Sequence, residues 1–160
     1  MTERIFAFLD SLGIKHSTVR HKPLFTVDDG RDLHGEIPGL HCKNLFLKDR
    51  KGRLWLVVMP CDKRAGLAAL EKKLCSGRLS FGSAELLMEV LGVAPGAVTP
   101  FALINDKTRR VTVVLDEDVM KAELVNFHPL RNDASTAILS ADLLKFINVL
   151  KYEAIIIDCG

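Results

Sequence analysis

The chain has 160 residues, of which 48% are hydrophobic and 26% are charged, a composition typical of a globular protein and not of a disordered or fibrous one. This length suits one hydrophobic core without a linker, so we expect a single domain over residues 1–160. The formal net charge of +2 excludes unspecific nucleic-acid binding by the whole surface, and a nucleic-acid partner would have to meet a local basic patch.

Residues 1–10 carry acidic side chains on both sides of a short apolar patch, unlike the basic start and long apolar core of a signal peptide. No run approaches the roughly 20 apolar residues that a membrane span requires. The four cysteines form no Cys-x-x-Cys pair, which favours free thiols in a reducing compartment over disulfides or a zinc site. We therefore expect a cytoplasmic protein with no membrane partner.

The first elements are a helix and a strand. Thr2 is a suitable N-cap for a helix that Gly13 ends, because the apolar residues between them recur on one helical face. Residues 14–20 predict a first strand, and Thr26 followed by two aspartates indicates the start of another helical turn.

Two apolar segments, 43–48 and 53–59, flank the turn sequence 49–52 and predict an antiparallel hairpin. Because side chains alternate across a strand, Lys43 would share a face with two leucines, whereas Asn44 would lie on the other face. A partly desolvated lysine at this place would seek an anionic or carbonyl partner.

Two helices are predicted next. Asp62 is placed to cap a helix that runs to about Leu74, and Ser83 to cap a helix over residues 84–91 that Gly92 ends. Basic side chains recur on and near the first of these helices. A solvated helix face is the simpler interpretation of that pattern, and a phosphate-contacting patch is the functional one.

The loop Gly96–Pro100 lies between two predicted elements. Glycine permits a close approach of the backbone and proline stiffens the exit, so this loop can offer amide groups to a carbonyl or a phosphate. The pattern alone favours an ordinary loop. Residues 101–104 and 111–115 then predict a second hairpin, and Asp116 is placed to cap a short helix that ends near residue 123.

The last part of the chain predicts strands at 124–128 and 134–139, a helix from Ser140 through residue 150, and a closing strand at 152–158 that is apolar enough to be central in the sheet. Hairpins mixed with helices indicate an α+β fold, with a mixed, mostly antiparallel sheet surrounded by helices.

Common catalytic motifs are absent from the sequence: it has no Gly-x-Ser-x-Gly elbow, no nucleotide-binding glycine loop and no His-Glu-x-x-His helix. The spacing of His34, His41 and Cys42 matches no common zinc module, so we expect no metal. An activated thiolate at Cys42 is disfavoured, because Cys42 and Lys43 would face opposite ways on a strand. The remaining polar set suits the binding of a polar ligand and the positioning of water, and consists of Lys43, Asn44, Asp62, His128 and Thr136.

Four motifs follow one another along nearly the whole chain: Pro23-x-Phe25-Thr26, Lys43-Asn44-Leu45-Phe46-Leu47, Gly96-x-x-x-Pro100 and Phe127-His128-Pro129-Leu130-x-Asn132-x-x-x-Thr136. Together they resemble the YbaK-like prolyl-tRNA editing family, and most of all its free-standing deacylases that clear alanine mischarged on tRNA(Pro). The resemblance implies a mixed sheet wrapped by helices and the hydrolysis of the ester between a wrong amino acid and the terminal adenosine.

The resemblance also implies roles for individual residues. Lys43 stands at the place of the family's essential lysine, with Asn44 beside it, and His128 at the place of the pocket histidine. Asp62 aligns with an acidic position, although the segment 59–62 departs from the family pattern. The implied substrate-binding residues are Phe25, Thr26, Asp62, Gly96, Ala97, Val98, Thr99, Pro100 and Thr136.

The expected partner is the acceptor end of tRNA(Pro), with prolyl-tRNA synthetase as a further candidate, and neither DNA nor a cofactor is expected. Candidate tRNA contacts are the basic residues Arg50, Lys51, Lys63, Arg64, Lys72, Lys73 and Arg78. A fixed water would attack the activated ester, and a small pocket would admit small residues and exclude proline. Three alternatives stay open: a preference for mischarged cysteine or serine, a tRNA-binding or synthetase-binding module without catalysis, and a small-molecule hydrolase.

Overall fold

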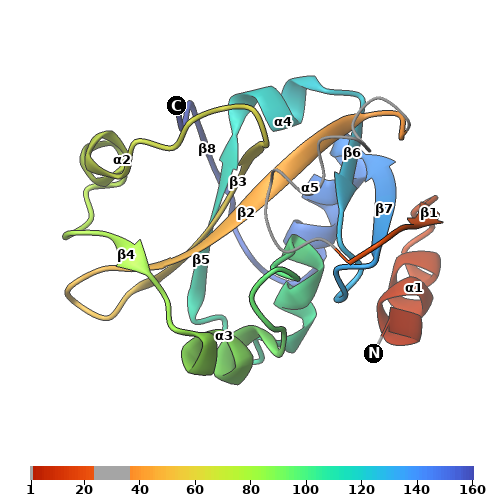
Figure 1. The fold of residues 1–160 in the computed structure, drawn as a ribbon, viewed down its shortest axis with the longest axis horizontal. Helices are drawn as coiled ribbons and strands as arrows, with labels where there is room; N and C mark the ends of the chain where they lie inside the picture. The colour runs from red at the N-terminus through yellow and green to blue at the C-terminus, as the bar shows by residue number, and fades with distance from the viewer. Residues whose placement is uncertain (1, 24–36) are drawn as a thin grey trace.

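The computed structural model describes residues 2–23 and 37–160 (Figure 1). Its strands are β1 (Ser17–Arg20), β2 (Leu40–Lys48), β3 (Leu54–Pro60), β4 (Ser80–Phe81), β5 (Val111–Asp116), β6 (Leu124–Phe127), β7 (Ala134–Leu139) and β8 (Ile155–Ile157). Its helices are α1 (Thr2–Ser11), α2 (Leu67–Leu74), α3 (Ala84–Leu91), the 3-10 helix η2 (Pro100–Asn105), α4 (Glu117–Lys121) and α5 (Ser140–Val149). None of the helices in these ranges is long and apolar enough to cross a membrane.

The strands form one mixed sheet in the order β1-β7-β6-β2-β3-β5-β8, and β4 pairs with β2 off this path. Four of the described strand pairs are antiparallel, namely β1·β7, β6·β7, β2·β3 and β2·β4. Three are parallel, namely β2·β6, β3·β5 and β5·β8. The predicted α+β class, with a mixed sheet in which antiparallel pairs are the majority, is therefore confirmed.

Apolar side chains pack on both faces of this sheet. On one face Phe46, Leu56 and Val58 join a larger core with residues of α1, α3, η2 and α5. On the other face Leu47 and Val57 join a smaller cluster that α2 covers. Because both faces are covered, every residue of β3 is buried.

Several local predictions are confirmed. The hairpin of β2 and β3 closes at Asp49, whose carboxylate accepts the amides of Lys51 and Arg53 at 3.0 and 2.9 Å. The Ser83 hydroxyl accepts the amide of Leu86, so it caps α3, and Gly92 ends that helix in the left-handed conformation. Asp116 caps α4 in the same way, although α4 ends at Lys121 and not near residue 123. The four cysteines are free thiols.

Three predicted elements are wrong. Asp62 caps no helix: it lies exposed in a turn, and α2 begins only at Leu67 with Gly66 as its N-cap. The neighbouring Lys63 side chain pairs with Asp116 of β5 and Asp158 near the C-terminus, which holds this segment as a turn.

Residues 101–104 form η2 and not a strand, because Pro100 at its first turn and the Thr99 cap favour a helical start. β5 therefore has no hairpin partner there and pairs in parallel with β3 and β8. The closing strand is short and lies at the edge of the sheet, where Ile155 and Ile156 are exposed. An apolar run predicts burial, but it does not say which strand becomes the edge.

The N-terminal prediction is partly confirmed. Thr2 begins α1, and β1 occupies only the second half of the predicted strand at 14–20. The predicted helical start at Thr26 lies outside the described residues.

Candidate functional site

Lys43 and His128 belong to neighbouring segments of the sheet: Lys43 lies in β2, and His128 directly follows β6. β2 and β6 run in parallel, with His41 paired to Asn126. Lys43 and His128 each come two residues later, so continuing this register past the end of β6 brings them level. Residues two apart on a strand share a face, so both side chains lie on the face opposite the larger core.

Two further polar side chains continue this row. In the register of β6 with β7, the last pair is Phe127 with Thr136, and continuing it by one residue sets His128, directly after β6, opposite Ser135. His21 directly follows β1, and its Nε2 lies 2.9 Å from the Ser135 hydroxyl oxygen. The rings of His21 and His128 are 6.2 Å apart. We call Lys43, His128, Ser135 and His21 the polar row.

His128 is held in one tautomer. Its Nδ1 lies 2.9 Å from the carbonyl oxygen of Ala134, and a carbonyl can only accept, so Nδ1 carries the proton and Nε2 keeps a lone pair in the neutral ring. Burial lowers the pKa of His128 and the nearby His21 and His41 lower it further, whereas the bond to Ala134 opposes this shift. The ring is therefore a neutral base at physiological pH.

Lys43 is half-buried and pairs across the hairpin with Met59. Cys61 follows two residues after Met59, in the turn directly after β3. Burial and the charge of Asp62 raise the pKa of the Cys61 thiol to about 11, and Lys43 acts in the opposite direction. Asp62 and Lys43 therefore lie within electrostatic reach of one thiol, and that thiol is neutral.

Cys42 also remains a neutral thiol, because burial raises its pKa well above the usual range. It packs against the larger core and therefore faces away from Lys43. This geometry does not support an activated thiolate at Cys42.

Two predicted residues lie on the other face of the sheet. Asn44 alternates with Lys43, and its Oδ1 is buried with no hydrogen-bond partner in the described part of the chain. Thr136 is fully buried, and its hydroxyl meets that of Thr18 at 2.8 Å. The structure therefore does not bring these two side chains to the face of the polar row.

The loop Gly96–Pro100 also belongs to the side of the larger core, where Ala97 and Val98 pack. Gly96 has a φ of 92°, a value that favours glycine. The amide of Ala97 donates to Ala94 at 3.0 Å and Pro100 has no amide, so at most three amides of this loop are available to a ligand. Within residues 2–23 and 37–160, no hydrogen bond joins the loop to Lys43 or His128.

Phe25 and Thr26 lie outside the described residues. So does His34 of the zinc set that we considered. In the two described ranges, no three His, Cys, Asp or Glu side chains are grouped so that they could hold a metal ion.

The basic residues proposed to contact tRNA have different surroundings. Lys63 is surrounded by the carboxylates of Asp116, Asp118 and Asp158 at 2.6 to 3.1 Å, and Lys73 donates to the carbonyl oxygen of Asp158. The exposed side chains are Arg50, Lys51, Arg64, Lys72, Lys73 and Arg78. In Figure 1 the turn that carries Arg50 lies at the opposite end of β2 from β6 and β7. The end of β2 at Lys48 is five residues, or about 17 Å, from Lys43.

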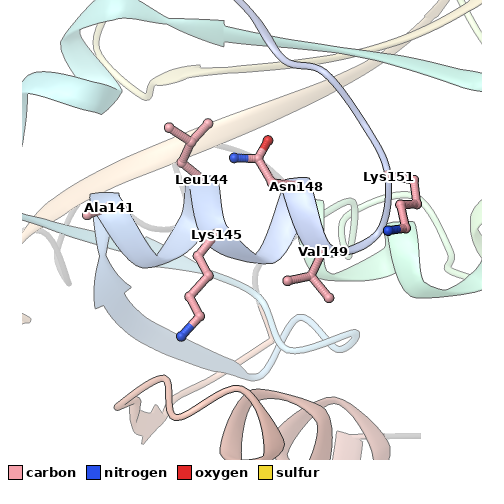
Figure 2. A pocket seen from close by; sticks show the side chains of 6 residues that line it. All are labelled: Ala141, Leu144, Lys145, Asn148, Val149 and Lys151. Atoms are coloured by element: carbon pink, nitrogen blue, oxygen red, sulfur yellow. The ribbon is translucent and has the colours of Figure 1, made fainter.

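An open hollow of about 550 Å³ lies elsewhere, on the outer side of α5, and is lined by Ala141, Leu144, Lys145, Asn148, Val149 and Lys151. Figure 2 shows Lys145 pointing toward α1, where its Nζ donates to the carbonyl oxygen of Leu12 at 2.6 Å. No residue of the polar row lines this hollow, so it is separate from the candidate site.

Sequence reasoning missed His21 and Ser135. Side chains alternate across the predicted strand at 134–139, and this alternation could have indicated that Ser135 shares a face with His128. Nothing near His21 in the sequence pointed to a partner 114 residues away.

The family of aminoacyl-tRNA editing domains matches residues 21–146 of this sequence, a range that contains the whole polar row. The chain belongs to this family. This YbaK-like editing domain is 36% identical to the prolyl-tRNA editing protein ProX of Acetoanaerobium sticklandii over 146 residues, which cover 91% of this chain and 89% of the relative. It is also 36% identical to prolyl-tRNA synthetase associated domain-containing protein 1 of Danio rerio over 153 residues, 94% of this chain and 83% of the relative.

Solved structures share the fold of this editing domain at low identity. The hypothetical protein APE2540 superposes with a TM-score of 0.77 at 20% identity, covering 97% of both chains. A structure described as a candidate trans-editing enzyme for prolyl-tRNA synthetase gives a TM-score of 0.73 at 20% identity, covering 99% of this chain and 97% of the other.

Proposed function

We propose that this editing domain is a trans-editing hydrolase that deacylates mischarged tRNA(Pro), with Ala-tRNA(Pro) as its preferred substrate. Family membership and the ProX relative support the reaction class. The observation that supports the proposal is the parallel register of β2 with β6, which, continued by two residues, brings Lys43 and His128 to one face of the sheet. A cation and a neutral base on one face suit ester hydrolysis.

The reaction follows from these two groups. Water attacks the carbonyl carbon of the aminoacyl ester, and the Nε2 lone pair of His128 takes one proton from that water. The Lys43 ammonium stabilises the negative charge that develops on the carbonyl oxygen. The bond from the carbonyl carbon to the ribose oxygen then breaks, and the proton held by His128 passes to that oxygen. Free amino acid and tRNA(Pro) are the products.

Selectivity acts by exclusion. A synthetase pocket built for proline rejects a smaller residue weakly, because a missing methylene is worth about 1 to 3 kcal/mol. A second site that admits small side chains and excludes the proline ring corrects the error. Asn44, Thr136 and the loop Gly96–Pro100 are candidates for contacts to the aminoacyl group, although in the described chain they lie on the side of the larger core.

The test is a deacylation panel with Ala-, Cys-, Ser- and Pro-tRNA(Pro). We expect the fastest release with Ala-tRNA(Pro), no release with Pro-tRNA(Pro), and the loss of most of the rate in Lys43→Ala. Lys48→Ala is the matched control, since Lys48 is exposed at the other end of the same strand. Equal rates for the wild type and Lys43→Ala would refute the role of Lys43.

The same panel separates the alternatives. Faster release of cysteine or serine would change the substrate and keep the reaction class. Mischarged tRNA that is bound but remains intact would favour a binding module instead. Turnover of simple amino-acid esters without tRNA would favour a small-molecule hydrolase.

A further inference from the structure

His21 and Ser135 form a hydrogen bond whose direction the structure fixes. The Nδ1 of His21 lies 2.8 Å from the carbonyl oxygen of Lys22, which can only accept, so Nδ1 is the nitrogen that donates. In the neutral tautomer that this bond selects, Nε2 is an acceptor, and the Ser135 hydroxyl donates to it across 2.9 Å. The hydroxyl proton of Ser135 thus points toward His21, and the lone pairs of its oxygen are left for another donor.

That oxygen stands beside His128. Continued by one residue past Phe127 and Thr136, the antiparallel register sets Ser135 opposite His128, where Cβ atoms are about 4.5 to 5.5 Å apart. The ring of His21, which is bonded to Ser135, lies 6.2 Å from that of His128. His128 presents the lone pair of Nε2, because its Nδ1 donates to Ala134. The Nε2 of His128 and the hydroxyl oxygen of Ser135 are therefore neighbouring hydrogen-bond acceptors on the face that carries Lys43.

We propose that His21 and Ser135 act as one positioning pair that gives the attacking water a second hydrogen-bond acceptor. This proposal rests on the proposed function. The water donates one hydrogen to Nε2 of His128 and the other to the Ser135 oxygen. Both hydrogens are then directed away from the ester, and a lone pair of the water faces the carbonyl carbon. His21 holds the Ser135 hydroxyl in the accepting orientation and does not touch the reacting atoms.

The pair is not needed to join β1 to β7. Four residue pairs between Ser17–Arg20 and Ala134–Ala137 already connect these strands, and the amide of His21 donates to the carbonyl oxygen of Asp133 at 2.9 Å. On the other face of the same strand pair, the hydroxyls of Thr18 and Thr136 form a second side-chain bond at 2.8 Å.

The experiment measures single-turnover release of alanine from Ala-tRNA(Pro) and the steady-state kcat and KM. Ser135→Ala and His21→Asn each remove the bond, and Asn is too short to reach Ser135. We expect each to lower kcat about 10- to 100-fold with KM unchanged, as misplaced reacting groups do. The double variant should lose no more than either single one, because both changes remove the same interaction.

Two further variants separate positioning from structure. His21→Gln places a carbonyl oxygen where Nε2 was and should recover much of the rate. His16→Asn makes the same substitution at a histidine outside the polar row, whose Nε2 lies 2.8 Å from Asp10 Oδ1, and it should keep the wild-type kcat. An unchanged kcat in His21→Asn, no recovery in His21→Gln, or an equal loss in His16→Asn would each overturn the proposed role of the pair.

These outcomes are distinct from a failure of the proposed function. A wild-type protein that cleaves none of the panel would refute the deacylase proposal, and the role of the pair in it. An active wild type with an inactive Lys43→Ala and a fully active His21→Asn would refute the pair alone. The tautomer is tested without turnover by ¹⁵N NMR of the histidine rings: we expect the proton of His21 on Nδ1, and a proton on Nε2 would overturn the arrangement.

Discussion

Replacement of Lys63 by methionine tests whether this lysine holds the fold together or remains available for RNA. Its Nζ lies 3.0 Å from Asp116 Oδ2, 3.1 Å from Asp118 Oδ2 and 2.6 Å from Asp158 Oδ1. These carboxylates belong to the end of β5, to α4 and to the C-terminal segment. The substitution keeps the aliphatic stem and removes the charge.

The magnitude depends mainly on Asp116. Its carboxylate is fully buried, whereas those of Asp118 and Asp158 are about half exposed, so their pairs with Lys63 are screened by water. Removing one partner of a buried ion pair costs about 3 to 5 kcal/mol. Asp116 keeps the amides of Asp118 and Cys159 at 2.8 and 2.9 Å, so we expect a loss of about 2 to 3 kcal/mol in the free energy of unfolding.

The pH dependence of this stability difference follows from two pKa shifts of opposite sign. The carboxylates raise the pKa of Lys63, so its stabilisation is complete below the unfolded value of about 10.4 and is lost only in strong alkali. Lys63 lowers the pKa of Asp158, so that stabilisation is present above about pH 4 and is lost as the solution is acidified. The difference between wild type and variant should therefore be constant near neutral pH and shrink in acid.

The assay is urea unfolding followed by circular dichroism, with Lys72→Met as the control because Lys72 is exposed on α2. If Lys63→Met and Lys72→Met unfold at the same urea concentration, the ion cluster does not stabilise the fold and the reasoning fails. A weaker affinity of folded Lys63→Met for tRNA, without a change in unfolding, would assign Lys63 to RNA instead.

Two further predictions concern the core and the base. Tyr152→Phe removes a hydroxyl that donates to the buried Asp106 at 2.8 Å, and we expect it to lower the free energy of unfolding by about 1 to 2 kcal/mol; urea unfolding identical to the wild type would contradict this. Because burial lowers the pKa of His128, the ring stays neutral to a lower pH, so the deacylation rate should fall only below the usual histidine pKa of about 6.5. A rate that already falls as the pH drops through 7 would show that His128 is not the base.

Elements that depend on local contacts could be predicted from the sequence. Ser83 and Gly92 bound α3 because a capping hydroxyl and a left-handed glycine act within one helical turn. Asp49 closes its hairpin through amides two and four residues away. The alternation of β2 likewise predicted that Lys43 and Asn44 face opposite sides of the sheet.

Features that depend on distant partners could not be predicted in this way. Phe101 packs edge to face against Phe127 and Phe146, and the sequence around residues 101–104 contains no sign of these contacts. Asp62 failed as a cap because Lys63 is drawn toward residues more than 50 positions away. Thr136 lies in the same motif as His128, and only the register of β6 with β7 places it on the opposite face.

The polar row also constrains when the protein can become active during its own synthesis. Its members come from strands that span residues 21 to 135, and β7 ends only at Leu139. A nascent chain has no such row until nearly the entire polypeptide has left the ribosome, because contacts between distant segments form late. Truncated translation products that stop before β7 would therefore lack the polar row, however well their hairpin of β2 and β3 had formed.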